Sequence, residues 1–384
     1  MRLLLLDPPE ALVVELSRRD HDLLVVDRWV SPLARQLGGP RHEFVKLVST
    51  QKISFSAIKQ VRAMIRRFRP EVIHAFRPDS LSHALIGSWG MKTPPSIVSY
   101  RGITRVPNRL DPGDWISYLS KRVSAHACES EAVKQAMVEG GIPKEKCTVV
   151  YNCVTSSEPA GSAAELRSQL NIPADAFVVG TVASIRPIKG VDILLKAAAE
   201  CASLPDIYFL IVGECNDPAV EKLARDPRLH NRLKMTGRLP EARRMMTVFD
   251  IFVMPSRQEA LCRALLEAMV EAVCPIVSDA GGMKEIVRHG RDGLVFPTEN
   301  VQGLSENINR LYEDRKLLAA LGQSAQERVR DVCSSARFAD RLEAVYQTAL
   351  GNSAKPSRRG GASDASPQPA LPIKRYAPST KAIR

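Results

Sequence analysis

The sequence has few aromatic residues and no long apolar run. Phe, Trp and Tyr make up 5% of its 384 residues, so stacking platforms for nucleic acid are scarce and no specific nucleic-acid partner is expected. The apolar run Leu3 to Leu6 ends at Asp7-Pro8-Pro9, too short for a signal peptide or a membrane span. We therefore expect a cytoplasmic protein, either soluble or peripheral at the inner membrane.

Metal-binding patterns are also missing. The eight cysteines are scattered, with no Cys-x-x-Cys pair and no Cys/His cluster at metal spacing, which argues against structural zinc and for a reducing compartment. The sequence thus predicts a metal-independent protein without a bound cofactor.

The length predicts two domains, and the charge is unevenly spread between them. The net charge is +12, with 23 basic and 15 acidic residues in 1–155. From Gly351 the chain is rich in Ser, Pro and Gly and carries 7 basic and 1 acidic residues, a composition typical of a disordered tail over 351–384. This positive charge favours an anionic surface or acceptor, or serves solubility alone.

Apolar runs alternate with helical patterns, which predicts an α/β fold with doubly wound parallel sheets. The first domain, 1–155, has strand-like runs at 72–76, 96–100 and 148–151, and helical patterns near 53–69, 79–90, 115–122 and 130–139. A polar linker over 155–164 leads into a second domain, 156–334. Ligands of such sheets bind at the carboxyl ends of strands, so a cleft between two facing sheets is expected.

Two glutamates, Glu259 and Glu267, lie at either end of a strand-to-helix connection. The first is expected in a loop, and the second one turn inside the helix. Backbone N–H groups at Leu261, Cys262 and Arg263 would face a phosphate at the helix start, and a carboxylate one turn in can bind a ribose diol. The structural alternative is that acidic residues simply favour the helix dipole.

A second strand-to-helix connection carries two cations, Arg186 and Lys189, within Arg-Pro-Ile-Lys-Gly. An arginine can grip diphosphate oxygens as a fork, and a lysine can act as a point charge. A solvated basic loop is the alternative.

These motifs occur in one order with several others. The others are Leu210-Ile-Val-Gly213, Met235-Thr-Gly-Arg238, Phe249 to Ser256 and Gly281-Gly282-Met-Lys-Glu285-Ile286. Together they resemble the C-terminal half of the retaining GT-B glycosyltransferases of the family-four (group 1) kind, closely over 177–297 and loosely over 1–350. The resemblance implies two Rossmann-like domains facing across a cleft, with the helix at 335–350 packing back on the first domain.

The resemblance also implies site roles. The catalytic residues would be Glu259, Lys189 and Arg186, with Glu259 beside the anomeric carbon of the donor sugar. The donor site would comprise Arg186, Lys189, Arg238, Leu239, Glu259, Leu261, Cys262, Arg263 and Glu267. Many relatives have Gly-Arg where this chain has Ala183-Ser184, so Arg186 is the proposed substitute for the usual diphosphate arginine.

The acceptor half carries weaker signals. Relatives often have a histidine where this chain has Arg101, and an arginine can steady an oxyanion but cannot act as a base. Arg77 and Arg105 are further acceptor-side candidates, while structural ion pairs are the alternative. His74 ends a strand-like run, and a buried, hydrogen-bonded histidine is expected there rather than a catalytic one.

The stretch Ile58 to Arg69 is a basic amphipathic helix. Its apolar face is expected to pack on the sheet, with a membrane-surface role as the alternative.

The expected activity is transfer of a sugar, with retained configuration, from a nucleotide-diphosphate donor to a glycan or glycolipid. Lipopolysaccharide or another bacterial envelope glycan would be the setting. Two alternatives stay open: a nucleotide-sugar epimerase on the same fold, and a non-enzymatic binder of anionic ligands or nucleic acid.

Overall fold

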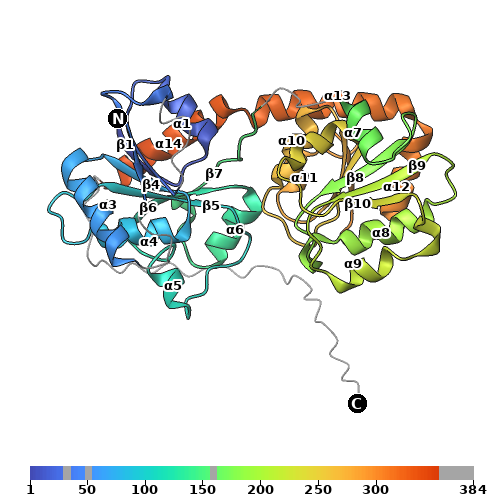
Figure 1. Cartoon of the computed structure of the whole chain (residues 1–384). Coiled ribbons are helices and arrows are strands. Elements are labelled where there is room, and N and C mark those ends of the chain that lie inside the picture. Colours follow the sequence, from blue (N-terminus) through green and yellow to red (C-terminus); the bar gives the residue numbers. More distant parts are fainter. Residues whose placement is uncertain (29–35, 48–53, 156–161, 354–384) are drawn as a thin grey trace, which may run out of the picture.

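Two parallel β-sheets, each flanked by helices, make up the molecule (Figure 1). The structure is a computed structural model that describes residues 1–28, 36–47, 54–155 and 162–353. All paired strands in both sheets run parallel, which confirms the predicted α/β fold with two doubly wound domains. The predicted tail at 351–384 lies almost entirely outside the described residues, as does most of the predicted linker.

The first sheet has the strand order β3-β2-β1-β4-β5-β6-β7. Its strands are β1 (Arg2–Leu6), β2 (Asp22–Asp27), β3 (His42–Lys46), β4 (Val72–Ala75), β5 (Ser96–Arg101), β6 (Val123–Cys128) and β7 (Cys147–Val149). The helices between them are α1 (Glu10–Ser17), α3 (Phe55–Phe68), α4 (Pro78–Gly87), α5 (Pro112–Trp115) and α6 (Glu131–Glu139). The central strands are buried on both faces, so they consist of nearly continuous apolar runs.

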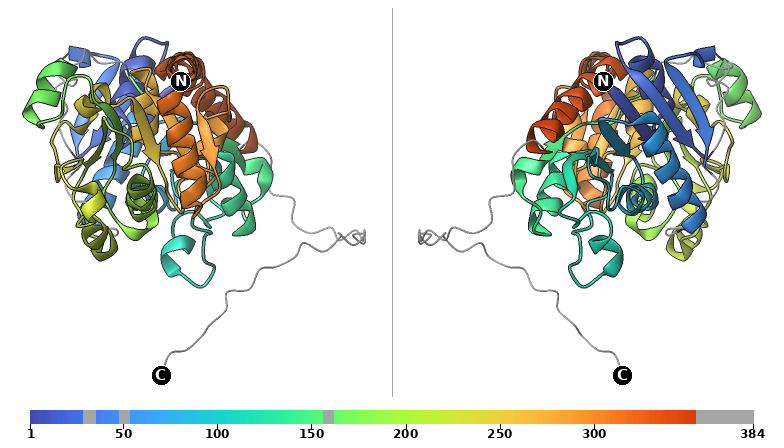
Figure 2. Two further views of the ribbon diagram at one scale, coloured as in Figure 1. Left: turned by 90° about the vertical axis from the view of Figure 1, so that its right-hand side faces the viewer. Right: turned by 90° about the vertical axis from the view of Figure 1, so that its left-hand side faces the viewer.

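The second sheet has the order β10-β9-β8-β11-β12-β13. Its strands are β8 (Phe177–Val182), β9 (Ile207–Val212), β10 (Leu233–Met235), β11 (Ile251–Met254), β12 (Cys274–Ser278) and β13 (Leu294–Phe296). Its helices are α7 (Ala163–Gln169), α8 (Val191–Glu200), α9 (Pro218–Leu223), α10 (Arg263–Val270), α11 (Met283–Ile286), α12 (Val301–Glu313) and α13 (Arg315–Val332). The end-on views show helices on both sides of the sheets (Figure 2).

The last helix, α14 (Ser335–Ser353), returns to the first sheet. Phe338, Leu342 and Tyr346 are fully buried among residues of β1, β4 and β5. The chain therefore passes between the domains twice, and the two passages touch: the Val154 N–H donates to the Cys333 carbonyl at 3.0 Å.

One predicted helix of the first domain is wrong. Residues 112–115 form the single turn of α5, turns follow, and β6 begins at Val123, so no helix spans 115–122. Asp111 caps that turn by accepting from the Gly113 N–H, and the Asp114 carboxylate bonds to Arg105 and to the Asn108 N–H, which fixes a compact loop in place of a helix. Within the described residues, no helix has the length and apolar character needed to cross a membrane.

Candidate functional site

Two loops that follow neighbouring strands build the centre of the site. The loop 183–190 connects β8 to α8, and the loop 255–262 connects β11 to α10. Because β8 and β11 are paired and parallel, both loops leave the same edge of the sheet. Gly190 has φ +66°, and a side chain there would lie 2.0 Å from the Pro255 carbonyl oxygen, so only glycine permits the loops to approach this closely.

This approach brings Lys189 and Glu259 together. The Lys189 Nζ lies 2.5 Å from Glu259 Oε2, and the side chains are only 19% and 13% exposed. The Ser256 hydroxyl also donates to the same carboxylate oxygen at 3.4 Å. A partly buried pair of this kind is held more firmly than a surface ion pair, so the cation and the carboxylate are fixed in advance of any ligand.

Arg257 ties the two loops to each other. Its guanidinium donates to both carboxylate oxygens of Asp192, in the first turn of α8, at 2.7 and 2.9 Å and to the Pro187 carbonyl at 2.5 Å. Its backbone N–H donates to the Ile188 carbonyl at 2.9 Å. The hydrogen bonds to Asp192 and Glu299 raise the pKa of Arg257. Arg257 and Asp192 therefore position the loop that carries Lys189.

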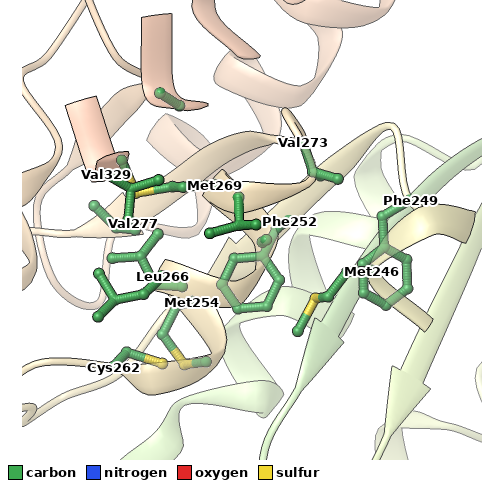
Figure 3. Close-up of a cluster of buried hydrophobic side chains, with 14 of the residues drawn as sticks. Met246, Phe249, Phe252, Met254, Cys262, Leu266, Met269, Val273, Val277 and Val329 are labelled. Atoms are coloured by element: carbon green, nitrogen blue, oxygen red, sulfur yellow. The ribbon is translucent and has the colours of Figure 1, made fainter. Parts of the chain in front are cut away.

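The start of α10 is anchored by side chains that pack into the apolar core of the second domain. Cys262 and Leu266 point into the same apolar cluster as Phe252 and Met254 of β11 (Figure 3). Burial raises the pKa of the Cys262 thiol to about 12, so it packs as a neutral group.

Above this anchor, the backbone N–H groups of Leu261, Cys262 and Arg263 have no backbone acceptor within the described chain. They are available to an anion at the positive end of the helix.

Glu267 lies one turn inside α10, as predicted. Its carboxylate accepts from Arg263 Nε at 3.0 Å and is 13% exposed, whereas Arg263 is 78% exposed. An ion pair with so exposed a partner contributes little stability, so Arg263 can leave it at low cost.

The other predicted donor residues lie in the loops that follow β8 and β10. Arg186 and Arg238 are exposed, and neither side chain has a hydrogen-bond or ion-pair partner in the described part of the chain. Leu239 packs on the edge of the apolar cluster. Both arginines are thus free to contact a ligand, and their donor-binding roles stay predictions.

The Glu259 loop lies at the junction of the two domains. Gln258 donates to the Thr104 hydroxyl of the first domain at 2.7 Å. Ala260 is buried in an apolar cluster of that domain. The Glu259 carbonyl accepts from the Gly282 N–H at 3.3 Å. Glu285 accepts from the N–H groups of Glu131 and Ala132, at the start of α6, at 2.8 and 3.1 Å. The site therefore faces the first domain directly.

A cavity of about 630 Å³ opens on the first-domain side. Its lining includes Asp7, Phe76, Tyr100 and Asn152 of the first domain and Arg263 of the second. This is where an acceptor could approach the Glu259 loop.

Of the three acceptor-side arginines, Arg101 is buried, whereas Arg77 and Arg105 are about half exposed. Arg101 is 1% exposed, donates to the Arg105 carbonyl at 2.7 Å and lies over the Tyr118 ring. Arg105 pairs with Asp114 at 2.8 Å, and Arg77 is 3.5 Å from Asp79. Burial favours the structural alternative for Arg101, and the acceptor roles of all three arginines stay predictions.

His74 is fully buried and hydrogen-bonded to the Tyr346 hydroxyl at 2.8 Å. Burial lowers its pKa to about 3. It is a structural histidine at the interface with α14.

The sequence reasoning missed Arg257, Asp192 and Glu129. No local pattern distinguishes Arg257 and Asp192 from other charged residues of loops and helices, because only the fold brings them together. Glu129 follows β6, a strand that was not recognised. In the described ranges, no group of three or more His, Cys, Asp or Glu residues is placed to hold a metal ion.

Two family models match consecutive parts of the chain. One, described as glycosyl transferases group 1, matches residues 162–328, and the other, described as glycosyltransferase family 4, matches residues 10–158. The chain belongs to this glycosyltransferase family.

Curated relatives and solved structures agree with this membership. A lipopolysaccharide core biosynthesis glycosyltransferase of Rhizobium meliloti is 23% identical over 70% of this chain and 73% of that protein. A D-inositol 3-phosphate glycosyltransferase of Thermobispora bispora is 31% identical over 54% of this chain, and the match spans about half of that protein (52%). HepE of Anabaena, solved with UDP, has a TM-score of 0.71 at 22% identity, covering 91% of this chain and 100% of that one. A Rickettsia africae glycosyltransferase reaches 0.74 at 18%, covering 91% and 99%. The structural likenesses establish the GT-B fold.

Proposed function

We propose that this glycosyltransferase moves a sugar from a nucleotide-diphosphate donor to a hydroxyl of a glycan or glycolipid, with retained anomeric configuration and without a metal ion. The Lys189–Glu259 pair at the domain junction is the observation that carries the proposal. A structural relative was solved with UDP-glucose, which makes nucleotide-diphosphate sugars the first donors to test.

The leaving diphosphate would be stabilised by three features of the second domain. Lys189 supplies a fixed positive charge, Arg186 a mobile one, and the start of α10 a row of free N–H groups. Charge that develops on the leaving oxygen is best stabilised by groups already in place. Glu267 would bind the ribose hydroxyls one turn further along α10, and Arg238 and Leu239 would lie near the base.

Glu259 would orient the donor sugar and stabilise positive charge near its anomeric carbon. Its salt bridge with Lys189 holds the carboxylate in place beside the donor. The acceptor hydroxyl would enter from the 630 Å³ cavity and attack the face from which the diphosphate leaves, with a diphosphate oxygen taking its proton.

The pathway proposal rests on the curated relatives. One acts in lipopolysaccharide core biosynthesis and another in O-antigen biosynthesis, so we infer an envelope glycan as the product. The exposed cations of α3, among them Arg66 and Arg67, would suit an anionic membrane surface that carries a glycolipid acceptor.

A donor screen tests the proposal. Purified wild-type protein is melted with UDP-, GDP-, ADP- and dTDP-sugars. We expect one class to raise the Tm, and Lys189→Ala to abolish the shift. The control Lys222→Ala removes an exposed lysine of α9 and should keep it. Protein that no nucleotide sugar stabilises would contradict the proposal.

Two product assays separate the alternatives. An epimerase would isomerise the selected donor with no acceptor present, whereas a transferase needs one. For a nucleic-acid binder, deletion of residues 354–384 would abolish binding to RNA or DNA. Our proposal expects that deletion to leave the donor-induced Tm shift unchanged.

A further inference from the structure

Glu129 is a buried carboxyl group beside the lining of the cavity of about 630 Å³ on the first-domain side, which we call the acceptor cavity. It follows the last residue of β6, is 7% exposed, and its N–H donates to the Arg101 carbonyl at 2.9 Å. One oxygen, Oε1, accepts from Asn152 Nδ2 at 3.2 Å. The other covers Gly102, where a Cβ would lie 2.7 Å from it. Glu129 thus joins the ends of β5, β6 and β7 at the edge of the sheet that faces the second domain.

The neighbours of Glu129 line the cavity that it supports. Asn152 and Tyr100 are both part of the lining. The side-chain oxygen of Asn152, Oδ1, accepts from the Cys153 N–H at 2.9 Å. Both ends of the Asn152 side-chain amide are therefore held. The Tyr100 hydroxyl is buried and interacts with the Glu129 carboxyl.

Glu259 lies across the domain junction from Glu129. Ser130, the next residue, contacts Gly282, and Gly282 donates to the Glu259 carbonyl. The charge of Glu259 therefore acts on Glu129, whereas no lysine or arginine within the described residues forms an ion pair with it.

These surroundings disfavour the ionised form. Burial raises the pKa of Glu129 to about 8; the hydrogen bond from Asn152 lowers it, while the charge of Glu259 raises it. The other titratable groups near it are the Tyr100 phenol on β5 and the thiols of Cys153, after β7, and Cys333, before α14. Burial raises the pKa of all three, so none carries charge near neutral pH.

We propose that Glu129 is a positioning residue of the acceptor side, a neutral carboxylic acid that holds Asn152 and Tyr100 in the cavity wall, across the domain junction from Glu259. A neutral acid can both donate and accept hydrogen bonds. It fixes the wall without adding a second negative charge beside a diphosphate donor.

The first test needs no ligand. Wild type, Glu129→Gln and the control Glu131→Gln are melted from pH 5 to pH 9. Wild type should lose stability relative to Glu129→Gln as the pH rises from about 4.5 toward about 8, because the folded state then binds a proton that the unfolded state has lost. The Tm advantage of Glu129→Gln over wild type should therefore grow by several degrees between pH 5 and pH 9.

The control should show no such trend, because the Glu131 side chain is half exposed. Parallel curves for wild type and Glu129→Gln would overturn the proposal. So would a Glu129→Gln protein that cannot fold at pH 6, since a neutral amide should replace a neutral acid.

The second test rests on the proposed transferase function and uses the donor that the screen selects. Above about pH 8, kcat/KM of the wild type should fall, while that of Glu129→Gln should not. Asn152→Ala should raise the acceptor KM about tenfold and leave the donor KM unchanged. A loss of about a hundredfold or more in Glu129→Gln at pH 7 would instead make Glu129 a general base and overturn the proposal. If the wild type uses no nucleotide sugar, the proposed function fails, and the melting curves still decide the charge of Glu129.

Discussion

Glu259 and Lys189 depend on each other, so their substitution should be costly for catalysis. Glu259→Ala leaves Lys189 without its partner, and Lys189→Ala removes the fixed charge from the site. We expect each to reduce transfer by about 10²–10³-fold, the range for losing one preorganised electrostatic contact in a transition state. The assay is kcat/KM with the selected donor, and circular dichroism checks the fold. Near-wild-type turnover in either folded variant would remove the pair from the catalytic site.

Glu267 provides a sharper test of donor binding. Glu267→Gln should raise the donor KM about 10- to 100-fold, because hydrogen bonds from ribose hydroxyls to a charged carboxylate would be weakened. Arg263→Ala is the matched control, since it breaks the same ion pair but keeps the carboxylate. Calorimetric titration with the nucleoside diphosphate measures both. Equal weakening in the two variants would indicate that the ion pair, not the ribose, needs Glu267.

At the residue scale, the sequence predicts the site residues that belong to a short local motif. It misses residues whose role depends on neighbours that only the fold brings close. Glu259, Lys189 and Glu267 lie in short local patterns, and the fold places them at one edge of the sheet. Arg101 also looked accessible, but Tyr118 and the Arg105 carbonyl enclose it. Burial of a long side chain depends on neighbours that no local pattern reveals.

At the scale of elements, Gly190 allows the two site loops to meet. Gly190→Ala should destabilise the protein more than Gly290→Ala, although both glycines have similar positive φ, +66° and +72°. The second has nothing within 4 Å of the added Cβ, so its cost is the backbone term alone, about 1 kcal/mol. Gly190→Ala adds a clash with the Pro255 carbonyl and should also lose donor binding. Urea unfolding measures the difference, and equal losses would mean that the loops can separate without cost.

The elements themselves follow from periodicity wherever a helix or strand is amphipathic or fully buried. The helix at 55–68 begins where Ser54 caps it and buries one face, as its pattern predicts. The prediction of a helix at 115–122 is wrong, because side-chain hydrogen bonds of Asp111 and Asp114 stabilise turns in this part of the chain. Such local competition is invisible to a pattern of apolar residues.

For the whole molecule, buried histidines predict sensitivity to acid. Burial lowers the pKa values of His74 and His126 to about 3. The unfolded chain takes up protons at these residues below about pH 6.5, while the folded protein does not, so stability should fall as the pH falls. Each histidine contributes up to about 1.4 kcal/mol per pH unit within that window.

The variant His74→Asn should therefore show a shallower decline in unfolding free energy between pH 6.5 and pH 5 than the wild type, whatever its absolute stability. His230→Asn, at an exposed position, should decline like the wild type. Urea titrations at both pH values measure the slopes. A His74→Asn slope equal to that of the wild type would show that His74 is protonated in the folded protein.

The order of two parallel sheets and the return of α14 could be expected from alternation and family resemblance. The facing of the two domains also follows from that resemblance, but the individual contacts between them do not, because contacts such as Gln258 to Thr104 join distant parts of the chain.

The hydrogen bond between Val154 and Cys333 joins the two chain segments that connect the domains. The domains also meet where Gln258 donates to Thr104 and where Glu285 accepts from the start of α6, so opening about the connecting segments has to break those contacts. The parts of the domains farthest from the connecting segments would then move most, and the segments themselves least. Substrate entry and product exit would accordingly be governed by one angular coordinate, which a pair of fluorophores placed across the mouth of the cleft would report directly.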